Sequence, residues 1–359
     1  MKHQLHIFPG FGVGGVQRRF AQLYHALPEW RHTVVSLSGE FSASSLCGDG
    51  ARLATRTVNV RRSRGVSPRN ATMLADLIRD IAPDLLCTYN WGSMEAVMGN
   101  RTGPRLPHLH FEDGFGPEEA NRRFRKRNLV RAMALRGRTL TVVPSRQLEK
   151  ITKEEWGLPP SRYRYLPNGV DTERFSPAAQ TESQSSVVGT VAALRAEKNI
   201  GRLLRLASRL GRASSLTIVG SGPEQALLRS QADALGVEAE FTGPMEDTAP
   251  AYRQFTVFAL TSDTEQMPLT VLEAMASGLP VLATDVGDVK AMVSEENRPF
   301  VLPPANENQL STALSVLLND SDLRARIGAA NRQRVLAHYS EAGMITAYGD
   351  LFDEMVTAL

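Results

Sequence analysis

The chain has 359 residues, of which 42% are hydrophobic and 22% are charged, and its net charge is +3. These values are typical of a globular protein of one or two domains, and they argue against binding of polyanions over the whole surface. The cysteines, Cys47 and Cys87, are too few for a disulfide framework or a cysteine metal site, which fits a reducing cytoplasm.

Membrane-spanning and exported proteins are the next classes that the pattern argues against. No apolar run approaches the ~18 residues that a membrane-spanning helix needs. Residues 1–40 lack a long apolar core, so we expect no signal peptide. We therefore expect a cytoplasmic protein, whose contact with the inner face of a membrane would be peripheral.

The first half of the chain alternates between short apolar strands and amphipathic helices. Residues 4–8 form the first expected strand, and the helix that begins near Gly15 carries Val16, Phe20 and Leu23 on one face. Further strands are expected at 32–37, 57–60, 84–88, 107–111 and 140–144, the last of this half, with helices at 70–81 and 93–99. This alternation predicts a parallel sheet.

A glycine-rich turn joins the first strand to its helix. Gly10, Gly12 and Gly15 satisfy the pattern G-x-G-x-x-G, which alone is a weak signal for a dinucleotide. A bound NAD would also require an acidic residue at the end of the second strand, and Glu40 is a poor candidate for that role. A tight strand-to-helix turn is the alternative interpretation.

Polar side chains gather at the end of the fifth expected strand, in the segment HFEDGFG. His108 and His110 alternate along the strand and therefore share one face. No third ligand is in view, so we do not interpret them as a metal site. An Asx turn at Asp113, before Gly114, is one interpretation of the remaining polarity.

The most basic segment spans residues 117–138, with eight Lys or Arg against Glu118 and Glu119. One hypothesis is that the positive residues from Arg122 to Arg127 contact anionic lipid headgroups or a lipid-diphosphate acceptor. A solvated helix is the alternative, since the basic residues surround the first turns instead of forming one face. No recognised nucleic-acid-binding module accompanies the charge, so we expect no nucleic-acid partner.

A second alternating half begins after the polar stretch at 180–186. Strands are expected at 187–194, 216–219, 255–261 and 281–283, with a strand end at 241–243 and helices at 306–318, 321–336 and 342–355. The last helix is amphipathic. Asp320 is expected as an N-cap, so the pattern Asp320-x-Asp322 indicates capping instead of a metal site.

Two cations lie where the first strand of this half meets its helix. Arg195 and Lys198, beside a helix N-terminus at a strand's carboxyl end, suit a diphosphate, and a solvated charged loop is the alternative. The later strands are followed by Gly220, Gly222 and Gly243, which would let the backbone approach a nucleotide closely.

Residues 261–287 (TSDTEQMPLTVLEAMASGLPVLATDVG) form the most informative stretch, with Glu265 in a loop and Glu273 in an otherwise apolar helix. Pro268 pre-sets the first helical turn. No Lys or Arg stands three or four residues from Glu273, so its charge needs a partner from elsewhere. This partner could be the vicinal hydroxyls of a sugar. The alternative is that Glu273 contacts a core Arg or faces water.

The spacing from Glu265 to Glu273, followed by AMASGLPVLATDVGD, resembles the retaining glycosyltransferases of family 4. The segment NGVDTERFSP, before the polar stretch, and the GTVAALRAEKN pattern around Arg195 and Lys198 extend the resemblance over nearly the whole chain. It implies a GT-B fold, in which two Rossmann-like α/β domains with parallel sheets face each other across a cleft. Residues 1–175 would bind the acceptor, 176–340 the nucleotide-sugar, and 341–359 would cross back to the first domain.

The resemblance also implies roles for individual residues. Asp113 stands where the family commonly has a His, a departure, and would orient the acceptor hydroxyl or take its proton. Arg195 and Lys198 would stabilise the leaving diphosphate. Glu265 would bind the hydroxyls of the donor sugar, and Glu273 would bind the ribose diol. Donor contacts are further expected from the backbone or side chains of Gly14, Gly15, Gly220, Gly222, Gly243, Gln266, Met267 and Leu269.

The expected activity is transfer of a sugar from a UDP- or GDP-linked donor to the hydroxyl of a sugar, lipid-linked or small-molecule acceptor, in bacterial polysaccharide or glycolipid assembly. No metal or other cofactor is expected. The alternatives are an inactive GT-B partner subunit that keeps the donor pocket, an oxidoreductase that uses a nicotinamide cofactor, and a nucleotide-sugar epimerase, which the Glu265 and Glu273 spacing disfavours. The residues identify neither the sugar, the base nor the acceptor.

Overall fold

The computed structural model describes residues 1–60, 65–115, 119, 123–178, 186–210 and 214–357. The chain forms two compact units, one of Met1–Pro167 with Met344–Leu359 and the other of Asn168–Gly343. We expected the boundary after residue 175, whereas Phe175 is buried in the core of the second unit, edge-on to Tyr252 at 5.6 Å between ring centroids. The polar stretch expected at the boundary lies outside the described residues, apart from Ser186.

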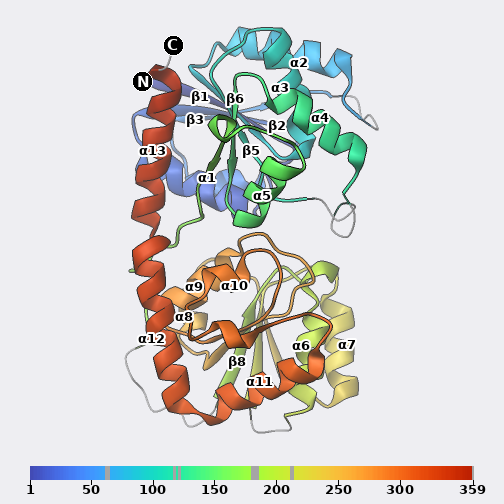
Figure 1. The fold of residues 1–359 in the computed structure, drawn as a ribbon, viewed down its shortest axis with the longest axis vertical. Coiled ribbons are helices and arrows are strands. Elements are labelled where there is room, and N and C mark those ends of the chain that lie inside the picture. Colours follow the sequence, from blue (N-terminus) through green and yellow to red (C-terminus); the bar gives the residue numbers. More distant parts are fainter. Residues whose placement is uncertain (61–64, 116–118, 120–122, 179–185, 211–213, 358–359) are drawn as a thin grey trace. The chain divides into compact units, whose positions relative to one another are not determined.

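The first unit contains a parallel sheet of seven strands in the order β3-β2-β1-β4-β5-β6-β7 (Figure 1). The strands are β1 (Lys2–Phe8), β2 (Trp30–Ser36), β3 (Leu53–Thr57), β4 (Leu85–Tyr89), β5 (His108–Phe111), β6 (Thr139–Val143) and β7 (Tyr163–Tyr165). The helices are α1 (Gly15–Ala26), α2 (Pro68–Ile81), α3 (Met94–Thr102), α4 (Arg125–Leu135), α5 (Arg146–Glu154) and α13 (Glu341–Thr357), of which residues 344–357 belong to this unit. The central strands β4 and β5 are buried along their whole length, as continuous apolar runs predict for a parallel sheet.

Two expectations about the strands of this unit are wrong, one about the bounds of a strand and one about which strand is the last. The strand expected at 57–60 is instead β3, which ends at Thr57 and pairs only with β2. As an edge strand it is largely exposed and lacks an apolar signal, whereas Val58 and Val60 pack on the core from the loop that follows. The strand at 140–144 is not the last, because β7 pairs with β6; its three residues are too short for a periodic pattern.

The C-terminal helix α13 completes the core of the first unit. Phe352 packs edge-on against Trp30 at 5.9 Å, and Tyr348 stacks on Phe111 at 6.1 Å between ring centroids. Each fully buried aromatic side chain contributes roughly 1.5–3 kcal/mol through the apolar area that it removes from water. The expectation that the last helix returns to the first domain is therefore confirmed.

The second unit contains a parallel sheet of six strands in the order β10-β9-β8-β11-β12-β13 (Figure 1). The strands are β8 (Ser186–Val191), β9 (Ser214–Val219), β10 (Ala239–Gly243), β11 (Val257–Leu260), β12 (Val281–Thr284) and β13 (Val301–Leu302). The helices are α6 (Ile200–Ser208), α7 (Gln225–Leu235), α8 (Ala249–Tyr252), α9 (Leu269–Ala276), α10 (Val289–Met292), α11 (Glu307–Asn319) and α12 (Ser321–His338).

Helix α9 lies at the centre of the second unit, with Leu272 and Met275 fully buried. Helix α12 packs on it so closely that a Cβ atom added at Gly328 would lie 2.0 Å from the Gly278 carbonyl oxygen. Helix α12 begins at its expected cap, because the Asp320 carboxylate accepts a hydrogen bond of 2.8 Å from the Leu323 amide. These contacts fix the turn that follows α9.

Each sheet has one point at which the strand order reverses. In the first unit it lies between β1 and β4, and in the second between β8 and β11. Ligands of open parallel sheets bind at the carboxyl ends of the strands beside such a point, facing helix N-termini. The loops after these four strands are therefore the places to look for functional side chains.

Candidate functional site

In the second unit, the loops after β8 and β11 are joined by an ion pair between two of the predicted site residues. Lys198 Nζ lies 2.6 Å from Glu265 Oε1, and the Ser262 hydroxyl donates to the same oxygen at 2.7 Å. The Glu265 side chain is 9% exposed and that of Lys198 is 25% exposed, so the pair is partly shielded from solvent. An anionic ligand at Lys198 would have to share the ammonium group with Glu265 or displace it.

Further hydrogen bonds hold these two loops in register. Asn199, in the left-handed conformation at φ 44°, caps α6 by accepting from the Arg202 amide at 3.1 Å. Arg202 donates to the Thr261 carbonyl at 2.6 Å and to Asp263 at 2.8 Å. These hydrogen bonds hold the two loops, and with them Lys198 and Glu265, in place. The sequence did not predict that Arg202 and Asp263 contribute to this network.

Arg195, the other predicted cation, is exposed in the middle of the β8–α6 loop. Among the described residues its guanidinium group has no ion pair or hydrogen bond, in contrast to Lys198. A guanidinium group that the described residues leave unpaired near a helix N-terminus suits a phosphate oxygen.

Glu273 lies half-buried on α9 and has a core partner that its neighbours in sequence do not reveal. The Tyr252 hydroxyl donates to Glu273 Oε2 at 2.7 Å and to the Thr270 carbonyl at 3.2 Å. Tyr252 itself is fully buried. A buried Tyr is thus one partner of Glu273, and it helps to fix the orientation of the carboxylate.

The glycines of the second unit are required chiefly by the packing of the loops on each other. A Cβ atom at Gly220, where φ is 129°, would lie 2.0 Å from the Ala192 carbonyl oxygen, and one at Gly222 would lie 2.4 Å from that of Leu194. The Gly220 amide also donates to the Gly243 carbonyl at 2.9 Å. These glycines thus bring the ends of β8, β9 and β10 together, which is a structural reason for them beside the expected approach of a nucleotide.

The expected donor contacts at Gln266, Met267 and Leu269 lie where the loop enters α9. The Gln266 carbonyl accepts from the Asp288 amide at 2.8 Å, and the Met267 carbonyl accepts from the Asn168 side chain at 3.1 Å. Leu269, the first residue of α9, is only partly buried. The carbonyl groups of Gln266 and Met267 are thus already hydrogen-bonded within the second unit.

Gly287 is a residue of this site that sequence reasoning did not single out. It has a φ of 57°, and a Cβ atom there would lie 2.5 Å from the Glu265 carbonyl oxygen and 2.6 Å from that of Gln266. The signal that could have found it is the Val286-Gly287-Asp288 turn after β12. Gly287 sets the position of the backbone that carries Glu265.

In the first unit, Asp113 forms a bidentate ion pair with Arg19, at 2.6 and 2.9 Å. Arg19 is buried and lies over the rings of Phe111 and Tyr348, at 5.7 and 5.8 Å. Burial alone would lower the pKa of Arg19, but the Asp113 carboxylate outweighs it and raises that pKa above its usual value. The Asp113 amide also donates to Asn90 Oδ1 at 2.7 Å, so the carboxylate is held in one orientation.

The glycine-rich turn of the first unit is filled by side chains of the chain itself. A Cβ atom at Gly12 would lie 2.4 Å from Glu40 Oε1, and the Gln17 side chain donates to the Gly10 carbonyl at 3.1 Å. Gly14 is the N-cap of α1 and Gly15 its first residue. The tight-turn interpretation thus accounts for Gly10 and Gly12.

His108 and His110 lie inside the sheet, where both rings hydrogen-bond to the Thr88 hydroxyl at 2.8 Å. Burial lowers the pKa of His108 well below its usual value, and the charge of His110 lowers it further. Throughout the described part of the chain, no group of three or more His, Cys, Asp or Glu side chains is arranged to hold a metal ion.

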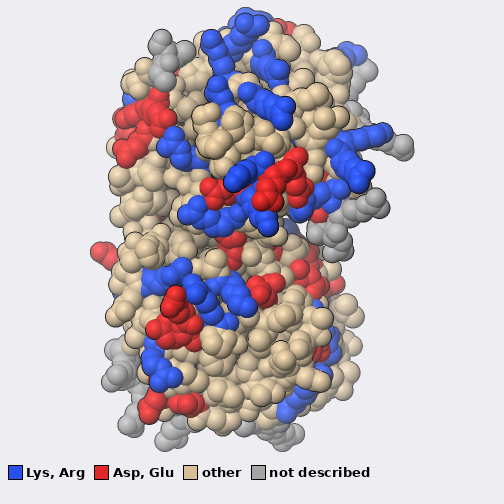
Figure 2. Space-filling view, in the orientation of Figure 1, with Lys and Arg blue, Asp and Glu red and all other residues tan. Residues whose placement is uncertain are grey.

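The basic segment is partly neutralised by acidic residues, one within it and two from outside it. Arg131 is fully buried and pairs with Glu112 at 3.2 Å and Glu119 at 3.3 Å, and Arg123 pairs with Glu155. Figure 2 shows Lys and Arg side chains interspersed with acidic side chains on the face where Figure 1 draws α4 and α5. Arg122 lies outside the described residues. Of the helices that are described, none is long and apolar enough to cross a membrane.

Comparison with known sequences divides the chain into the same halves. Residues 171–334 match the family described as Glycosyl transferases group 1, and residues 13–174 match Glycosyltransferase Family 4. The chain belongs to the family 4 glycosyltransferases.

Curated relatives of this family 4 chain match it over part of their length. The sulfoquinovosyl transferase SQD2 of Arabidopsis thaliana is 30% identical over 213 residues, which cover 55% of this chain and 41% of that protein. A GDP-mannose-dependent alpha-mannosyltransferase of Mycobacterium tuberculosis is 34% identical over 179 residues, 47% of this chain and 45% of that protein. The chain thus spans about half the length of the curated relatives that it matches.

Solved structures show the fold of this family 4 chain over its whole length. Sucrose-phosphate synthase from Thermosynechococcus elongatus has a TM-score of 0.83 at 20% identity and is covered completely, as is this chain. The Anabaena protein HepE, in complex with UDP, also has a TM-score of 0.83, at 17% identity, with 99% of this chain and 100% of HepE covered. The expected GT-B fold, with two Rossmann-like units, is confirmed.

Proposed function

We propose that this protein is a retaining glycosyltransferase that moves a sugar from a UDP- or GDP-linked donor to an acceptor hydroxyl in bacterial polysaccharide or glycolipid assembly. The observation that carries the proposal is the cluster at the strand reversal of the second unit. It combines Arg195, a cation that no described side chain pairs, with a second cation, Lys198, and a shielded carboxylate, Glu265. The names of the relatives, which include a GDP-mannose-dependent mannosyltransferase and a structure with UDP, support it.

The donor diphosphate binds at Arg195 and Lys198, beside the N-terminus of α6. During transfer the bond between the sugar carbon and the diphosphate oxygen breaks, and the departing oxygens gain negative charge. Two cations aimed at that charge stabilise the transition state more than the ground state, which is the requirement for catalysis. The donor separates Lys198 from Glu265, and the freed carboxylate accepts hydrogen bonds from hydroxyls of the transferred sugar.

Glu273 holds the ribose of the donor. Its carboxylate is oriented by Tyr252, so it accepts from the two ribose hydroxyls without first losing rotamer freedom. The expected approach of nucleotide to Gly220, Gly222 and Gly243, and of sugar to the loop of Gln266 and Met267, forms part of the same proposal.

Asp113 orients the acceptor hydroxyl. The bidentate pair with Arg19 already uses one lone pair of each carboxylate oxygen, which favours positioning over removal of a proton. The acceptor oxygen forms its new bond to the sugar carbon on the face that the diphosphate leaves, and its proton passes to a departing phosphate oxygen. No protein nucleophile and no metal ion take part in this scheme.

Steady-state kinetics and binding of nucleoside diphosphates test the proposal on the purified protein. UDP-glucose, UDP-galactose, UDP-N-acetylglucosamine and GDP-mannose are compared for donor turnover, and UDP and GDP for binding by calorimetry. We expect Arg195→Ala to reduce turnover on the order of 10²-fold. The matched control is Arg298→Ala, an exposed arginine of the same unit whose partner is Glu295. Binding of UDP or GDP without turnover of any donor would instead support an inactive partner subunit.

We further propose that the face of α4 contacts an anionic membrane. Besides its basic residues, this face exposes Phe124, Leu129 and Met133, whose exposed fractions are 44%, 59% and 53%. Leu129 and Met133 are four residues apart and therefore lie side by side, with Arg125 and Lys126 in the preceding turn. Exposed apolar groups bordered by cations are typical of helices that lie on an anionic lipid surface.

Sedimentation with vesicles tests the membrane proposal. We expect binding to phosphatidylglycerol vesicles but not to phosphatidylcholine vesicles, and loss of binding when Arg125 and Lys126 are both changed to Ala. Arg209 and Arg298, exposed arginines of the second unit, provide the control double variant. If the α4 variant sedimented with the vesicles as the unchanged protein does, the basic residues of α4 would not bind the membrane, and α4 would be a solvated helix.

A further inference from the structure

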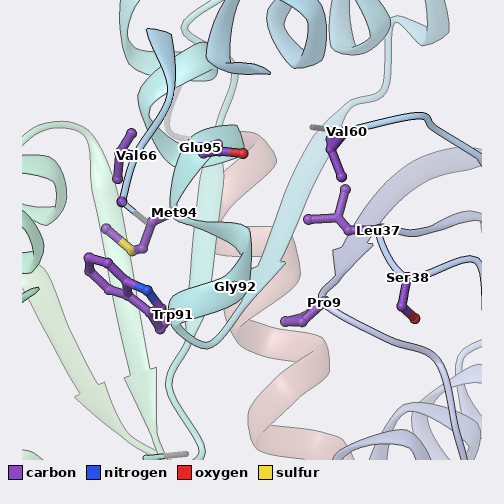
Figure 3. Close-up of a pocket in the computed structure, with 10 residues that line it drawn as sticks. Pro9, Leu37, Ser38, Val60, Val66, Trp91, Gly92, Met94 and Glu95 are labelled. Carbon is purple, nitrogen blue, oxygen red and sulfur yellow. The ribbon is translucent and has the colours of Figure 1, made fainter. Parts of the chain in front are cut away.

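The first unit has a pocket of about 340 Å³ at the reversal of its strand order, with Pro9 and Trp91 among the residues that line it (Figure 3). Residues 61–64, which lie in sequence between the lining residues Val60 and Gly65, are outside the described part of the chain. The charge of this pocket is therefore not defined, and its lining does not indicate one class of ligand. At the strand reversal of the second unit, by contrast, both loops are described in full.

Two hydrogen-bond donors share one oxygen of the Glu265 carboxylate. Lys198 Nζ lies 2.6 Å from Oε1, and the Ser262 hydroxyl lies 2.7 Å from the same oxygen. An ionised carboxylate accepts hydrogen bonds and cannot donate them, so the Ser262 hydroxyl is the donor. Among the described residues no group donates to Oε2, and that oxygen is therefore available to a hydroxyl of a ligand.

The Ser262 hydroxyl depends on Glu265 for its hydrogen bond. Ser262 is buried, with 1% exposure, and within the described part of the chain its hydroxyl has no other acceptor. If the carboxylate moved away, it would leave a buried polar group without a partner, which is costly. The Ser262 backbone is fixed as well, because the buried Thr284 hydroxyl of β12 donates to its carbonyl at 2.6 Å.

The residues on either side of Ser262 are bonded to the loop after β8 and to α6. Arg202 donates to the Thr261 carbonyl at 2.6 Å and to the Asp263 carboxylate at 2.8 Å. The Asp263 amide donates to the Glu197 carbonyl at 2.8 Å. None of these bonds involves the Lys198 side chain, so they remain when that side chain moves.

A donor diphosphate that draws Lys198 away therefore breaks only one of the two hydrogen bonds at Oε1 of Glu265. The bond from Ser262 stays, since both the hydroxyl and its backbone are held by contacts that the donor does not disturb. With one oxygen still bonded, the carboxylate does not regain the rotamer freedom that it lacks in the ion pair. It then pays little further entropy when it accepts a sugar hydroxyl.

We propose that Ser262 is a positioning residue for the transfer step, which holds the Glu265 carboxylate in place after a donor has drawn Lys198 away. The carboxylate then presents Oε2 to a hydroxyl of the transferred sugar. This inference rests on the proposed function and deepens it. It assigns recognition of the sugar to the pair of Ser262 and Glu265, separately from recognition of the diphosphate by Arg195 and Lys198.

Crystal structures of two variants test the position of the carboxylate without a donor. Lys198→Ala removes the ammonium group from Oε1, as a bound diphosphate would. In this variant we expect Glu265 to stay within hydrogen-bond distance of the Ser262 hydroxyl. In the double variant Lys198→Ala and Ser262→Ala, we expect it to adopt more than one conformer. A carboxylate that leaves Ser262 in the single variant, or keeps its place in the double variant, would overturn the inference.

Donor turnover and nucleotide binding test the role in transfer. Release of the nucleoside diphosphate is followed with UDP-glucose, UDP-galactose, UDP-N-acetylglucosamine and GDP-mannose, and binding of UDP and GDP is measured by calorimetry. For the donor with the highest turnover, Ser262→Ala should lower kcat about tenfold, because the carboxylate is less often in place. The Kd for UDP or GDP should change less than about twofold, because both cations remain. An equal loss of turnover and of nucleoside diphosphate binding would show general damage and overturn the inference.

Ser294→Ala is the matched control in the same unit. Ser294 is also buried, with 4% exposure, and its hydroxyl accepts from the Asn297 amide at 3.3 Å, outside the two loops of the site. The variant should leave kcat unchanged. If it lowered kcat as Ser262→Ala does, loss of any buried hydroxyl of this unit would explain the effect, and the inference would fail. The circular dichroism spectrum and Tm of each variant show that it is folded.

This inference and the proposed function fail in different ways. If the unchanged protein turns over none of the four donors and binds neither UDP nor GDP, the proposed function fails, and the role of Ser262 in transfer fails with it. If the unchanged protein turns over a donor and Ser262→Ala does so at the same rate, the proposed function stands while this inference fails.

Discussion

At the scale of the residue, the site is defined by pairings that cross from one loop to another. Lys198 and Glu265 are far apart in sequence, and the family resemblance predicts separate roles for them: Lys198 would bind the diphosphate and Glu265 the sugar hydroxyls. In the structure they form one ion pair at 2.6 Å, and a donor has to compete with that pair. Likewise, Glu273 looks uncompensated in sequence, but Tyr252 from α8 satisfies it.

The ion pair leads to opposite expectations for its two members. Lys198→Ala removes a phosphate ligand, so UDP or GDP should bind at least about tenfold more weakly. Glu265→Gln removes the competitor for Lys198, so binding of the nucleoside diphosphate should stay equal or become tighter, while donor turnover falls on the order of 10²-fold. Calorimetry with UDP and GDP, with donor turnover measured in parallel, checks both. Equal weakening by the two changes would contradict the division of roles.

Arg19 is expected to act through Asp113. Arg19→Lys keeps the charge but loses the bidentate geometry, because an ammonium group cannot match both carboxylate oxygens as a guanidinium group does. We expect the KM for the acceptor to rise or kcat to fall about tenfold, with the Kd for UDP or GDP unchanged. The acceptors tested are methyl α-D-glucoside, methyl α-D-mannoside and methyl α-D-galactoside. A weakened nucleoside diphosphate affinity would show that the change acts through general destabilisation.

At the scale of the element, the pattern of apolar residues predicted most helices and the buried strands, but not the contacts between them. Strands β4 and β12 are apolar runs and were expected within a residue or two of their observed bounds. The exposed edge strand β3 and the short strand β7 carry no such signal. Gly328 was not singled out, because nothing in the sequence of α12 shows that the Gly278 carbonyl lies against it.

Gly328 gives a test of helix packing. In an exposed helix, a change from Gly to Ala usually stabilises by about 1 kcal/mol. Gly328→Ala should instead lower the free energy of unfolding by about 1–3 kcal/mol, because the added methyl group meets the Gly278 carbonyl at 2.0 Å. The control is Gly349→Ala in α13, where the nearest atom would be at an ordinary 3.5 Å from Leu27, and it should be neutral or stabilising. Chemical denaturation followed by circular dichroism compares the two.

Gly287 gives a test of how the loop after β12 supports the site. Gly287→Ala should displace the Glu265 and Gln266 backbone, since φ is 57° and the new Cβ would lie 2.5 Å from the Glu265 carbonyl. We expect donor turnover to fall at least about tenfold, because small displacements of catalytic groups are costly. Gly236→Ala is the matched control, with φ 64° and open space around its Cβ. If both variants lose activity equally, backbone strain alone explains the effect.

At the scale of the whole molecule, the two units differ in how they hold ionisable groups. Six of the seven histidines belong to the first unit, and only His338 belongs to the second. His6 donates to or accepts from both Tyr89 and His32, at 2.9 and 3.0 Å, within the core. Burial, followed by the charge of Arg52, lowers the pKa of His32 from 6.5 to about 3, and burial also lowers that of His6.

These histidines predict that the first unit loses stability in acid. Their pKa values are lower in the folded than in the unfolded state, so the unfolded chain binds more protons below pH 6.5. Stability is fully present above that pH and falls as the pH drops toward about 3, the folded-state pKa of His32. Urea unfolding followed by tryptophan fluorescence reports on the first unit alone, because Trp30, Trp91 and Trp156 all belong to it.

A variant isolates the contribution of His32 from that of the carboxylates. His32→Gln should be less stable at neutral pH, since it loses the bond to His6, but its urea midpoint should change less between pH 7 and about pH 4.5. His25→Gln, at the exposed end of α1, is the control and should leave the pH dependence unchanged. If the urea midpoint of His32→Gln fell with pH as steeply as that of the unchanged protein, groups other than His32 would cause the acid sensitivity.

The position of α13 in the chain has a consequence for biosynthesis. Residues 344–357 are made after the whole second unit, yet they cover the aromatic core around Trp30 and Phe111 of the first unit, whose other residues are made before the second unit. Translation proceeds at about 5–20 residues per second, so that core waits on the order of ten seconds or more for its final helix. During this interval the nascent chain exposes an apolar surface to chaperones, and a product that stops before residue 344 keeps it exposed permanently.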